Sequence, residues 1–332
     1  MKLVTFEVST PLGPVERLGA WRGGRITDLN LAAALLYQRT EKARPEARAD
    51  HFVPPCLLGL LDGGHESLTE AQTALNTLKG APAGVVWKEG QVRLLAPLPR
   101  PRSLRDFFAF ENHAEAGARR RNEPLSPEWY EQPVFYKGNP RSIIGPGAII
   151  PWPAFTRKLD FEFEIAAVVG TAGRDIPVSK APRHIAGYIV MNDCSARDIQ
   201  RNEMVCRMGP AKGKDFATVL GPWFVTADEW NGSIPPLKVR VNGKEWSRSR
   251  GAQPYWNFAT MLSHASQGED LMPGDILGSG TYFKGCGLDM ARWIKPGDKI
   301  ELDAGPLGTL TNRVGKPNGS IHLKYKKPGA LA

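Results

Sequence analysis

Short apolar runs broken by glycine and proline constrain this fold more than any other feature of the sequence. In the second half of the chain, β-branched and aromatic runs alternate with Gly-Pro and Pro-Gly turns, with little room for helix. We expect strands at 148–150, 161–169, 185–191, 216–226, 237–241, 276–278, 299–302 and 308–313. This pattern, together with 35 Gly and 28 Pro, predicts a mainly antiparallel β domain of barrel or roll type.

The amino-terminal third of the sequence has a different pattern of apolar residues. Alternating apolar residues at its start predict strands, and Leu68, Ala71 and Leu75 share one face of a predicted helix. We therefore expect a small α+β domain at 1–96, a proline-rich linker at 97–103 and a larger domain at 104–332. The fold class expected for the whole chain is α+β, mainly β with some helix.

Composition excludes several functional classes. The net charge is +9, but no zinc-finger, RNP-type or basic-zipper pattern accompanies it, so we expect no nucleic-acid partner. A basic surface instead suits a small anionic substrate. No apolar run reaches the roughly 18 residues of a membrane span, and the first residues lack a secretory signal. Four scattered cysteines without a CxxC pair indicate reduced thiols, so we expect a cytoplasmic protein without a soft-metal site.

The stretch LDFEFEIAAVVG (159–170) carries the first candidate site. On a strand, Glu162 and Glu164 project from the same face because side chains alternate with a period of two. Two neighbouring carboxylates repel, and a hard cation such as Mg²⁺, Mn²⁺ or Ca²⁺ between them removes that cost. The alternative is a solvent-facing polar edge of an amphipathic strand.

A second candidate follows the apolar strand that ends at Asn192-Asp193. Asp193 lies where strand becomes helix, a common place for ligands. Arg197 and Gln200 are three apart on that helix and share a face, so both could point toward whatever Asp193 binds. The alternative is a surface helix capped by Ser195, with an Arg–Asp pair within the helix.

A helix predicted over 105–121 supplies the third candidate. Asp106 and His113 are seven apart, which is two helical turns, so we expect them on one face. Together they suit a metal ligand and a general base. The alternative for His113 is a structural histidine.

Two glycine-containing loops complete the pattern. The loop GPAKGKDFAT (209–218) has the wrong spacing for a phosphate loop, but it holds Lys214 where an ammonium could lie beside a metal. The turn GSGT (278–281) brings backbone close to another group.

These motifs in this order resemble the fumarylacetoacetate hydrolase family, over more than two-thirds of the chain. The anchors are Asp106…His113, LDFEFE (159–164), MNDCSARDIQ (191–200), GKDFAT (213–218) and GSGT (278–281). The resemblance implies a mixed β-roll, usually assembled as a homodimer, behind a small variable amino-terminal domain.

The resemblance also implies a role for each matching residue. The implied metal ligands are Asp106, Glu162, Glu164 and Asp193, and the implied general base is His113. Arg197, Gln200 and Lys214 would hold the substrate and stabilise charge, Thr218 would support the metal shell, and Tyr136 and Thr281 would line the pocket. Phe108 replaces a tyrosine of the pattern. Ala116 stands where some family members have the glutamate that orients the histidine, so the resemblance leaves that acid open, with Asp289 as a candidate.

The function implied is a divalent-metal-dependent hydrolase that cleaves a carbon–carbon bond in a 1,3-diketo acid resembling fumarylacetoacetate or an acylpyruvate. The alternative in the same family is an isomerase or decarboxylase of a 2-hydroxydienoate or an oxaloacetate-like acid in aromatic-compound catabolism. A third alternative is a binding protein that kept the scaffold, which His113, Lys214 and four carboxylates argue against.

Overall fold

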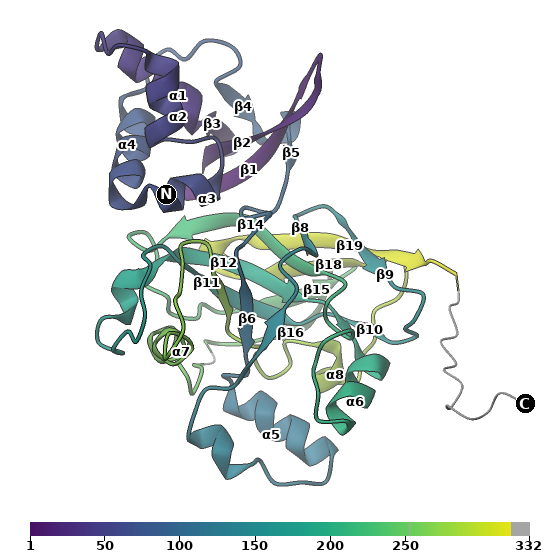
Figure 1. Ribbon diagram of the computed structural model, residues 1–332. Coiled ribbons are helices and arrows are strands. Elements are labelled where there is room, and N and C mark those ends of the chain that lie inside the picture. The colour runs from purple at the N-terminus through teal and green to yellow at the C-terminus, as the bar shows by residue number, and fades with distance from the viewer. Residues whose placement is uncertain (252, 320–332) are drawn as a thin grey trace, which may run out of the picture.

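The structure, a computed structural model, describes residues 1–251 and 253–319, so the end of the expected 104–332 domain lies outside the described residues. Figure 1 shows a smaller N-terminal region above a larger C-terminal region. The elements of the N-terminal region (1–96) are β1 (Lys2–Thr10), β2 (Gly13–Arg22), β3 (Arg25–Asp28), α1 (Leu29–Arg39), α2 (Pro45–Phe52), α3 (Leu57–Asp62), α4 (Gly64–Thr77), β4 (Val86–Lys88), η1 (Glu89–Gln91) and β5 (Arg93–Leu94).

The C-terminal region consists of short strands with a few short helices. Its first elements are β6 (Leu104–Phe107), α5 (Glu111–Arg120), η2 (Pro127–Tyr130), β7 (Phe135–Gly138), β8 (Ile143–Ile144), β9 (Ile149–Trp152), β10 (Leu159–Asp160), β11 (Phe163–Val169), η3 (Ala181–His184), β12 (Ile185–Asp193), β13 (Ser195–Ala196) and α6 (Arg197–Val205). They are followed by β14 (Thr218–Thr226), β15 (Lys238–Val241), β16 (Lys244–Arg248), α7 (Phe258–Ala265), β17 (Ile276–Gly278), α8 (Gly287–Met290), β18 (Lys299–Asp303), η4 (Gly305–Leu307) and β19 (Thr309–Pro317).

One large mixed sheet runs through both regions. Its strand order is β4-β3-β2-β1-β14-β12-β11-β17-β6-β7, and β1 joins the two regions by pairing antiparallel with β14. A second sheet has the order β16-β15-β18-β19-β9. Most pairs are antiparallel, but β17 runs parallel to β6, β14 to β8 and β19 to β9. The expected mixed β architecture with some helix is therefore confirmed.

Strand β11 is buried on both faces, which explains its nearly continuous apolar sequence. Ile165 and Ala167 belong to a hydrophobic cluster that extends to the second sheet, whereas Ala166 and Val168 belong to a cluster shared with the helices of the N-terminal region. A strand covered on both faces needs apolar residues at successive positions, not at alternate ones. The central sheet strands are thereby held rigidly between two packed layers.

All eight expected strands are present, with ends that differ by a few residues. The helix expected over 105–121 is wrong at its start, because Leu104–Phe107 form β6 and α5 begins only at Glu111. Strand β6 pairs with β17 on one side and β7 on the other, and all four of its residues are buried. Tertiary pairing therefore overrides local helical tendency here. Whether residues 1–96 fold as a separate domain stays a prediction.

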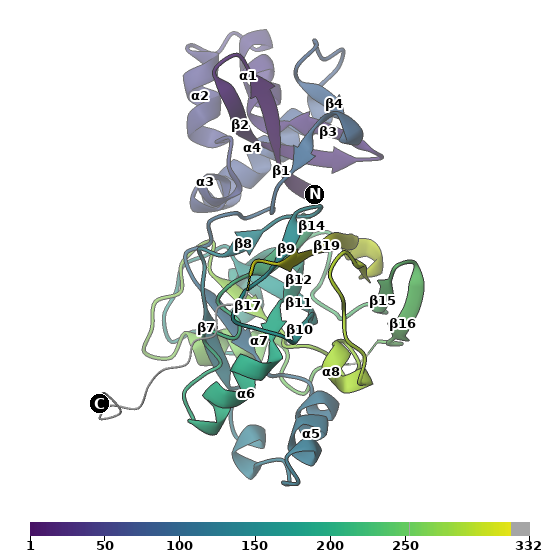
Figure 2. The ribbon, with the colours of Figure 1, turned by 90° about the vertical axis from the view of Figure 1, so that its right-hand side faces the viewer.

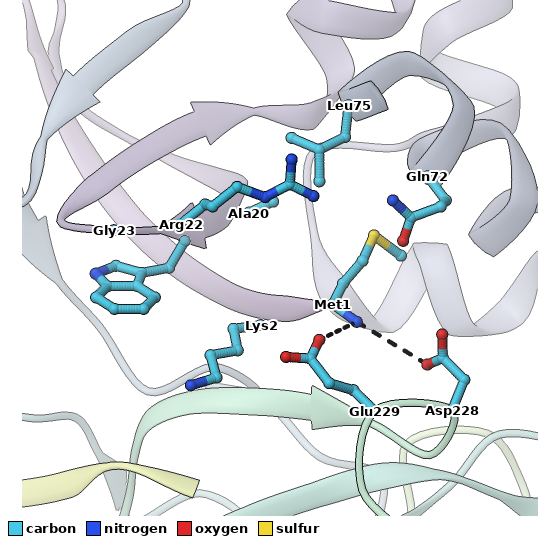
Figure 3. Close-up of a pocket in the computed structure, with 10 residues that line it drawn as sticks. Met1, Lys2, Ala20, Arg22, Gly23, Gln72, Leu75, Asp228 and Glu229 are labelled. Carbon is cyan, nitrogen blue, oxygen red and sulfur yellow. Dashed lines mark ion pairs between the residues drawn. The ribbon is translucent and has the colours of Figure 1, made fainter. Parts of the chain in front are cut away.

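A hollow of about 390 Å³ lies where the two regions meet (Figure 3). The amino group of Met1 pairs there with Glu229 at 2.7 Å and with Asp228 at 3.9 Å. In both Figure 1 and Figure 2, helices α5, α6 and α8 lie at the opposite end of the C-terminal region. Within the described parts of the chain, no helix is long and apolar enough to cross a membrane.

Candidate metal centre and catalytic site

Three buried carboxylates from three strands of the large sheet meet at one point. Asp106 lies on β6, Glu164 on β11 and Asp193 at the end of β12, and one oxygen from each lies within 4.8 Å of the others. Each residue is at most 3% exposed. The sheet therefore brings together three acids that are far apart in sequence, and the solvent-facing alternative for Glu164 is wrong.

The GSGT turn shapes the space between these acids. Gly278 on β17 lies opposite Asp106, and a Cβ atom at Gly278 would lie only 2.4 Å from Asp106 Oδ1. Gly280 has φ +74°, which favours glycine, and its N–H donates to Glu164 Oε2 at 2.9 Å. The two glycines therefore allow backbone to approach the carboxylates closely, as the sequence predicted.

The electrostatics of this cluster fit a bound cation. Burial, reinforced by the charges of Asp106 and Asp193, raises the pKa of Glu164 well above its ordinary value. Burial also raises the pKa of Asp193 to about 8, although the Lys214 ammonium opposes this shift. Glu164 Oε1 and Asp193 Oδ1 are both buried without a hydrogen-bond partner. Unpaired buried carboxylate oxygens are costly, and a hard divalent cation held by oxygen ligands would satisfy them.

Glu162 lies beside this cluster, in the cationic part of the site. Arg197 Nη1 lies 2.8 Å from Glu162 Oε1, and Lys214 Nζ lies 2.5 Å from Glu162 Oε2. Burial alone would raise the pKa of Glu162, but the charges of Arg197 and Lys214 outweigh it and hold that pKa below its usual range. The structure therefore gathers three of the four expected ligands in one group, with Glu162 adjacent and ion-paired. The solvent-facing alternative is wrong for Glu162 as well, because only 7% of the residue is exposed.

Lys214 joins the two parts of the site. Its ammonium contacts both Glu162 and Asp193 and is almost completely buried. Burial disfavours this charge, but Asp193 and Glu162 reverse the effect and raise the pKa of Lys214 above its ordinary value. Lys214 is therefore a permanent cation at neutral pH, suited to hold an anion and unsuited to accept a proton.

Asp160 is a residue that sequence reasoning missed. Its carboxylate accepts hydrogen bonds from Arg197 Nε at 2.8 Å and from the N–H groups of Gly287 and Leu288 at 2.8 and 2.9 Å. It thus fixes both the arginine of the site and the start of α8. The available signal was the alternation itself, because Asp160, Glu162 and Glu164 continue one period-two pattern.

His113 lies on α5 and is hydrogen-bonded to the acid expected to orient it. Its Nδ1 lies 2.7 Å from Asp289 Oδ2, and both side chains are at least nine-tenths buried. Burial opposes ionisation of Asp289, but the hydrogen bond and charge of His113 prevail and lower its pKa. Cys286 Sγ lies within 4.8 Å of both ligand atoms. Because His113 and Asp289 already bond directly, we interpret this group as a dyad, not as a second metal site.

The prediction that Asp106 and His113 lie on one face of a single helix is wrong. Asp106 belongs to β6 and His113 belongs to α5, so the two residues do not share a helical face. The chain turns between the strand and the helix, and Phe108 in that turn packs edge-on against the His113 ring with centroids 5.4 Å apart. Tertiary structure, not helical periodicity, brings His113 to the site.

The remaining expected residues have hydrogen bonds within the protein. Arg197 Nη1 donates to the side-chain oxygen Oε1 of Gln200 at 3.0 Å, which matches the face predicted for them. Tyr136 donates to Asp193 Oδ2 at 2.8 Å, and Thr281 donates to the Phe163 carbonyl at 3.0 Å. Thr218 on β14 lies opposite Asp193 in the sheet register. The roles of these residues toward a substrate stay predictions.

Comparison with known proteins agrees with this geometry. A family model described as fumarylacetoacetate (FAA) hydrolase, C-terminal, matches residues 103–315. Fumarylacetoacetase of Arabidopsis thaliana is 30% identical over 294 residues, covering 70% of this chain and 69% of that protein. The mitochondrial oxaloacetate tautomerase FAHD2A of Bos taurus is 30% identical over 320 residues, covering 95% and 91%.

A solved structure shows the same fold. Maleylpyruvate hydrolase from Sphingobium sp. SYK-6, in complex with manganese(II) ion and pyruvate, superimposes with a TM-score of 0.68 at 22% identity. The superposition covers 96% of this chain and 100% of the other. Because the family model spans well over half of the sequence and contains every carboxylate of the cluster, this chain belongs to the fumarylacetoacetate hydrolase family.

Proposed function

We propose that this chain is a divalent-metal-dependent hydrolase that cleaves a carbon–carbon bond in a 1,3-diketo acid resembling fumarylacetoacetate or an acylpyruvate. The observation that carries the proposal is the 2.7 Å contact between His113 and Asp289, with His113 within electrostatic range of Glu162. Hydrolysis needs a base that activates water, and a base needs a partner that fixes its tautomer.

His113 would take the proton from water. In the neutral imidazole that donates its Nδ1–H to Asp289, Nε2 keeps a lone pair that can accept this proton. The water oxygen would then add to a carbonyl carbon of the substrate, and the bond from that carbon to the central carbon would break. The departing carbon fragment leaves as an enolate and takes a proton, so that a carboxylic acid and a ketone or keto acid result.

Lys214 and Arg197 would hold the negative charge of the substrate and of the departing enolate. Both are buried cations fixed by carboxylates, so they need no rearrangement when charge develops. The proposed metal ligands are Asp106, Glu164 and Asp193, with Glu162 adjacent. A bound Mg²⁺, Mn²⁺ or Ca²⁺ would supply Lewis-acid stabilisation of the enolate oxygens.

The comparisons support a divalent metal and a keto acid. The structurally similar maleylpyruvate hydrolase holds manganese and pyruvate, and oxygen-only ligands suit Mg²⁺ equally well. A buried pair of cations also predicts a substrate with at least one carboxylate. Equal activity on a neutral diketone would count against this substrate class.

A panel of substrates tests the proposal. The protein would be given acylpyruvates, fumarylacetoacetate, oxaloacetate and 2-hydroxydienoates in the presence of Mg²⁺, and the products would be followed by mass. For an acylpyruvate, we expect the masses of the two products to add up to the mass of the substrate plus one water, about 18 mass units. No cleavage of any 1,3-diketo acid would overturn the hydrolase proposal.

A second candidate is an isomerase, tautomerase or decarboxylase acting at the same cluster. The observation that favours it is the similarity to oxaloacetate tautomerase over 95% of this chain. Substitution of His113 separates the two. A hydrolase should lose nearly all of its activity in His113→Ala, whereas a decarboxylase that depends on the metal alone would retain activity.

A further inference from the structure

A single buried carboxylate ties helix α5 to α8 at two points. Asp289 Oδ2 contacts His113 Nδ1 at 2.7 Å, and Asp289 Oδ1 accepts a hydrogen bond from Arg120 Nη1 at 2.8 Å. His113 and Arg120 are seven apart on α5, which places them on one face two turns apart. The backbone N–H of Lys284 also donates to Oδ2, at 3.0 Å.

We propose that Arg120 is a positioning residue for the general base, acting through Asp289. It would hold the carboxylate plane so that one oxygen always faces His113. The inference rests on the proposed function, because it assigns Arg120 a part in delivering that base.

The burial of Asp289 is the first reason. Its side chain is fully buried, so neither oxygen can rely on bulk water. Arg120 occupies the oxygen that His113 does not use, and the Arg120 side chain is 35% exposed. Without Arg120, a buried carboxylate oxygen would lose its cationic partner, and the carboxylate would be free to turn toward another donor.

The second reason is the direction of proton sharing between Asp289 and His113. A cation on Oδ1 favours the ionised form of Asp289, and an ionised carboxylate can only accept a hydrogen bond from the imidazole. An obligate acceptor beside Nδ1 favours the tautomer of His113 with its proton on Nδ1, which leaves the lone pair on Nε2 to accept a proton from water. Arg120 would thus favour one tautomer without contacting the substrate.

Arg119 provides a matched control in the same helical turn. It pairs with Glu115 at 3.0 Å in an exposed i,i+4 contact, and its side chain is 65% exposed. Removing Arg119 changes net charge and helix composition in the same way as removing Arg120. Of these two arginines, Arg120 contacts the dyad and Arg119 contacts Glu115.

The kinetic experiment compares Arg120→Ala, Arg120→Lys and Arg119→Ala in the full chain with Mg²⁺. For Arg120→Ala we expect kcat to fall about tenfold with KM within about twofold, because orientation of the base and not substrate binding is lost. Arg120→Lys should recover part of the loss, and Arg119→Ala should match the wild type. Equal kcat values for Arg120→Ala and Arg119→Ala would overturn the proposal.

A readout independent of turnover separates this inference from the proposed function. Nitrogen NMR of histidine-labelled protein reports which nitrogen of His113 carries the proton, with His113→Ala assigning the signal. We expect Nδ1–H alone in the wild type and a mixture of tautomers in Arg120→Ala. If no 1,3-diketo acid is cleaved but this shift occurs, the proposed function fails and the role of Arg120 stands. An unchanged tautomer in Arg120→Ala would overturn that role even in an active hydrolase.

Discussion

The two halves of the candidate site are built in different ways. The acidic half is carried by β6, β11 and β12, whose backbone positions are fixed by hydrogen bonds to neighbouring strands and by packed layers on both sides. The basic half consists of the proposed general base His113 and its partner Asp289. It is carried by α5 and by α8, which has only four residues. Side-chain contacts to Asp160 and Asp289 hold those helices in place.

This difference shows what fixes the side-chain positions in each half of the site. Neighbouring strands in a packed sheet hold their side chains in a fixed register, so the positions of the acidic residues are set mainly by the sheet. A short helix gains little from its own hydrogen bonds and depends on tertiary contacts. We therefore expect changes in the acidic half to remove metal binding, and changes in the basic half to lower the rate while metal binding remains.

The largest effect is expected for Glu164→Gln. The substitution keeps the side-chain volume but removes the charge at the centre of the cluster. Turnover should fall about ten-thousandfold or more, because about 5 kcal/mol of charge stabilisation is lost with the cation. Mn²⁺ binding followed by electron paramagnetic resonance should disappear as well. Glu115→Gln on the exposed face of α5 is the control, and a Glu164→Gln protein that binds Mn²⁺ normally would refute the assignment.

A smaller loss is expected for His113→Ala. Removing the base should lower kcat about a thousandfold, as is typical for general base catalysis. The affinity for Mn²⁺ should stay within about twofold, because the carboxylate cluster contains no atom of His113. Parallel loss of metal affinity and rate would show that the two halves do not act separately.

The smallest of the three effects is expected for Asp289→Asn. The amide still fills the space but no longer favours the Nδ1–H tautomer, so kcat should fall about a hundredfold. The pKa of Asp289 is lowered in the folded chain, so its ionisation stabilises the fold above its unfolded-state pKa. That contribution disappears as pH falls through the folded-state pKa.

Acid unfolding measures this second consequence. The wild type should lose more of its free energy of unfolding than Asp289→Asn between about pH 5 and pH 3, since only the wild type must protonate this carboxylate. Circular dichroism at fixed denaturant concentration gives the comparison. Identical pH dependence for both proteins would mean that the ion pairs of Asp289 add nothing to stability.

The same contrast explains what could be predicted from the sequence. Local patterns identified the strands, because apolar runs and turn residues are read within a few positions. Glu164 and Asp193 could be identified as candidates since alternation on a strand and the end of an apolar strand are also local signals. The acidic half was therefore largely predictable, although the strand at β6 was mistaken for helix.

The basic half was predicted less well because its contacts join distant segments. Asp289 lies 176 residues from His113, and only family resemblance suggested that they meet. Asp160 continues the period-two pattern of Glu162 and Glu164, but that pattern does not identify its partners, and Arg120 carries no pattern that distinguishes it from ordinary surface charges. Their importance follows from burial and from partners far along the chain, and neither can be read from periodicity.

The central claim is that Asp106, Glu164 and Asp193 hold one hard divalent cation that the reaction requires. Calorimetric titration of chelator-treated protein with Mg²⁺ or Mn²⁺ tests it most directly, with turnover measured at each point. We expect one ion per chain, with activity absent at the start and restored in step with occupancy. Full activity in the chelator-treated protein, together with no detectable ion binding, would contradict the account.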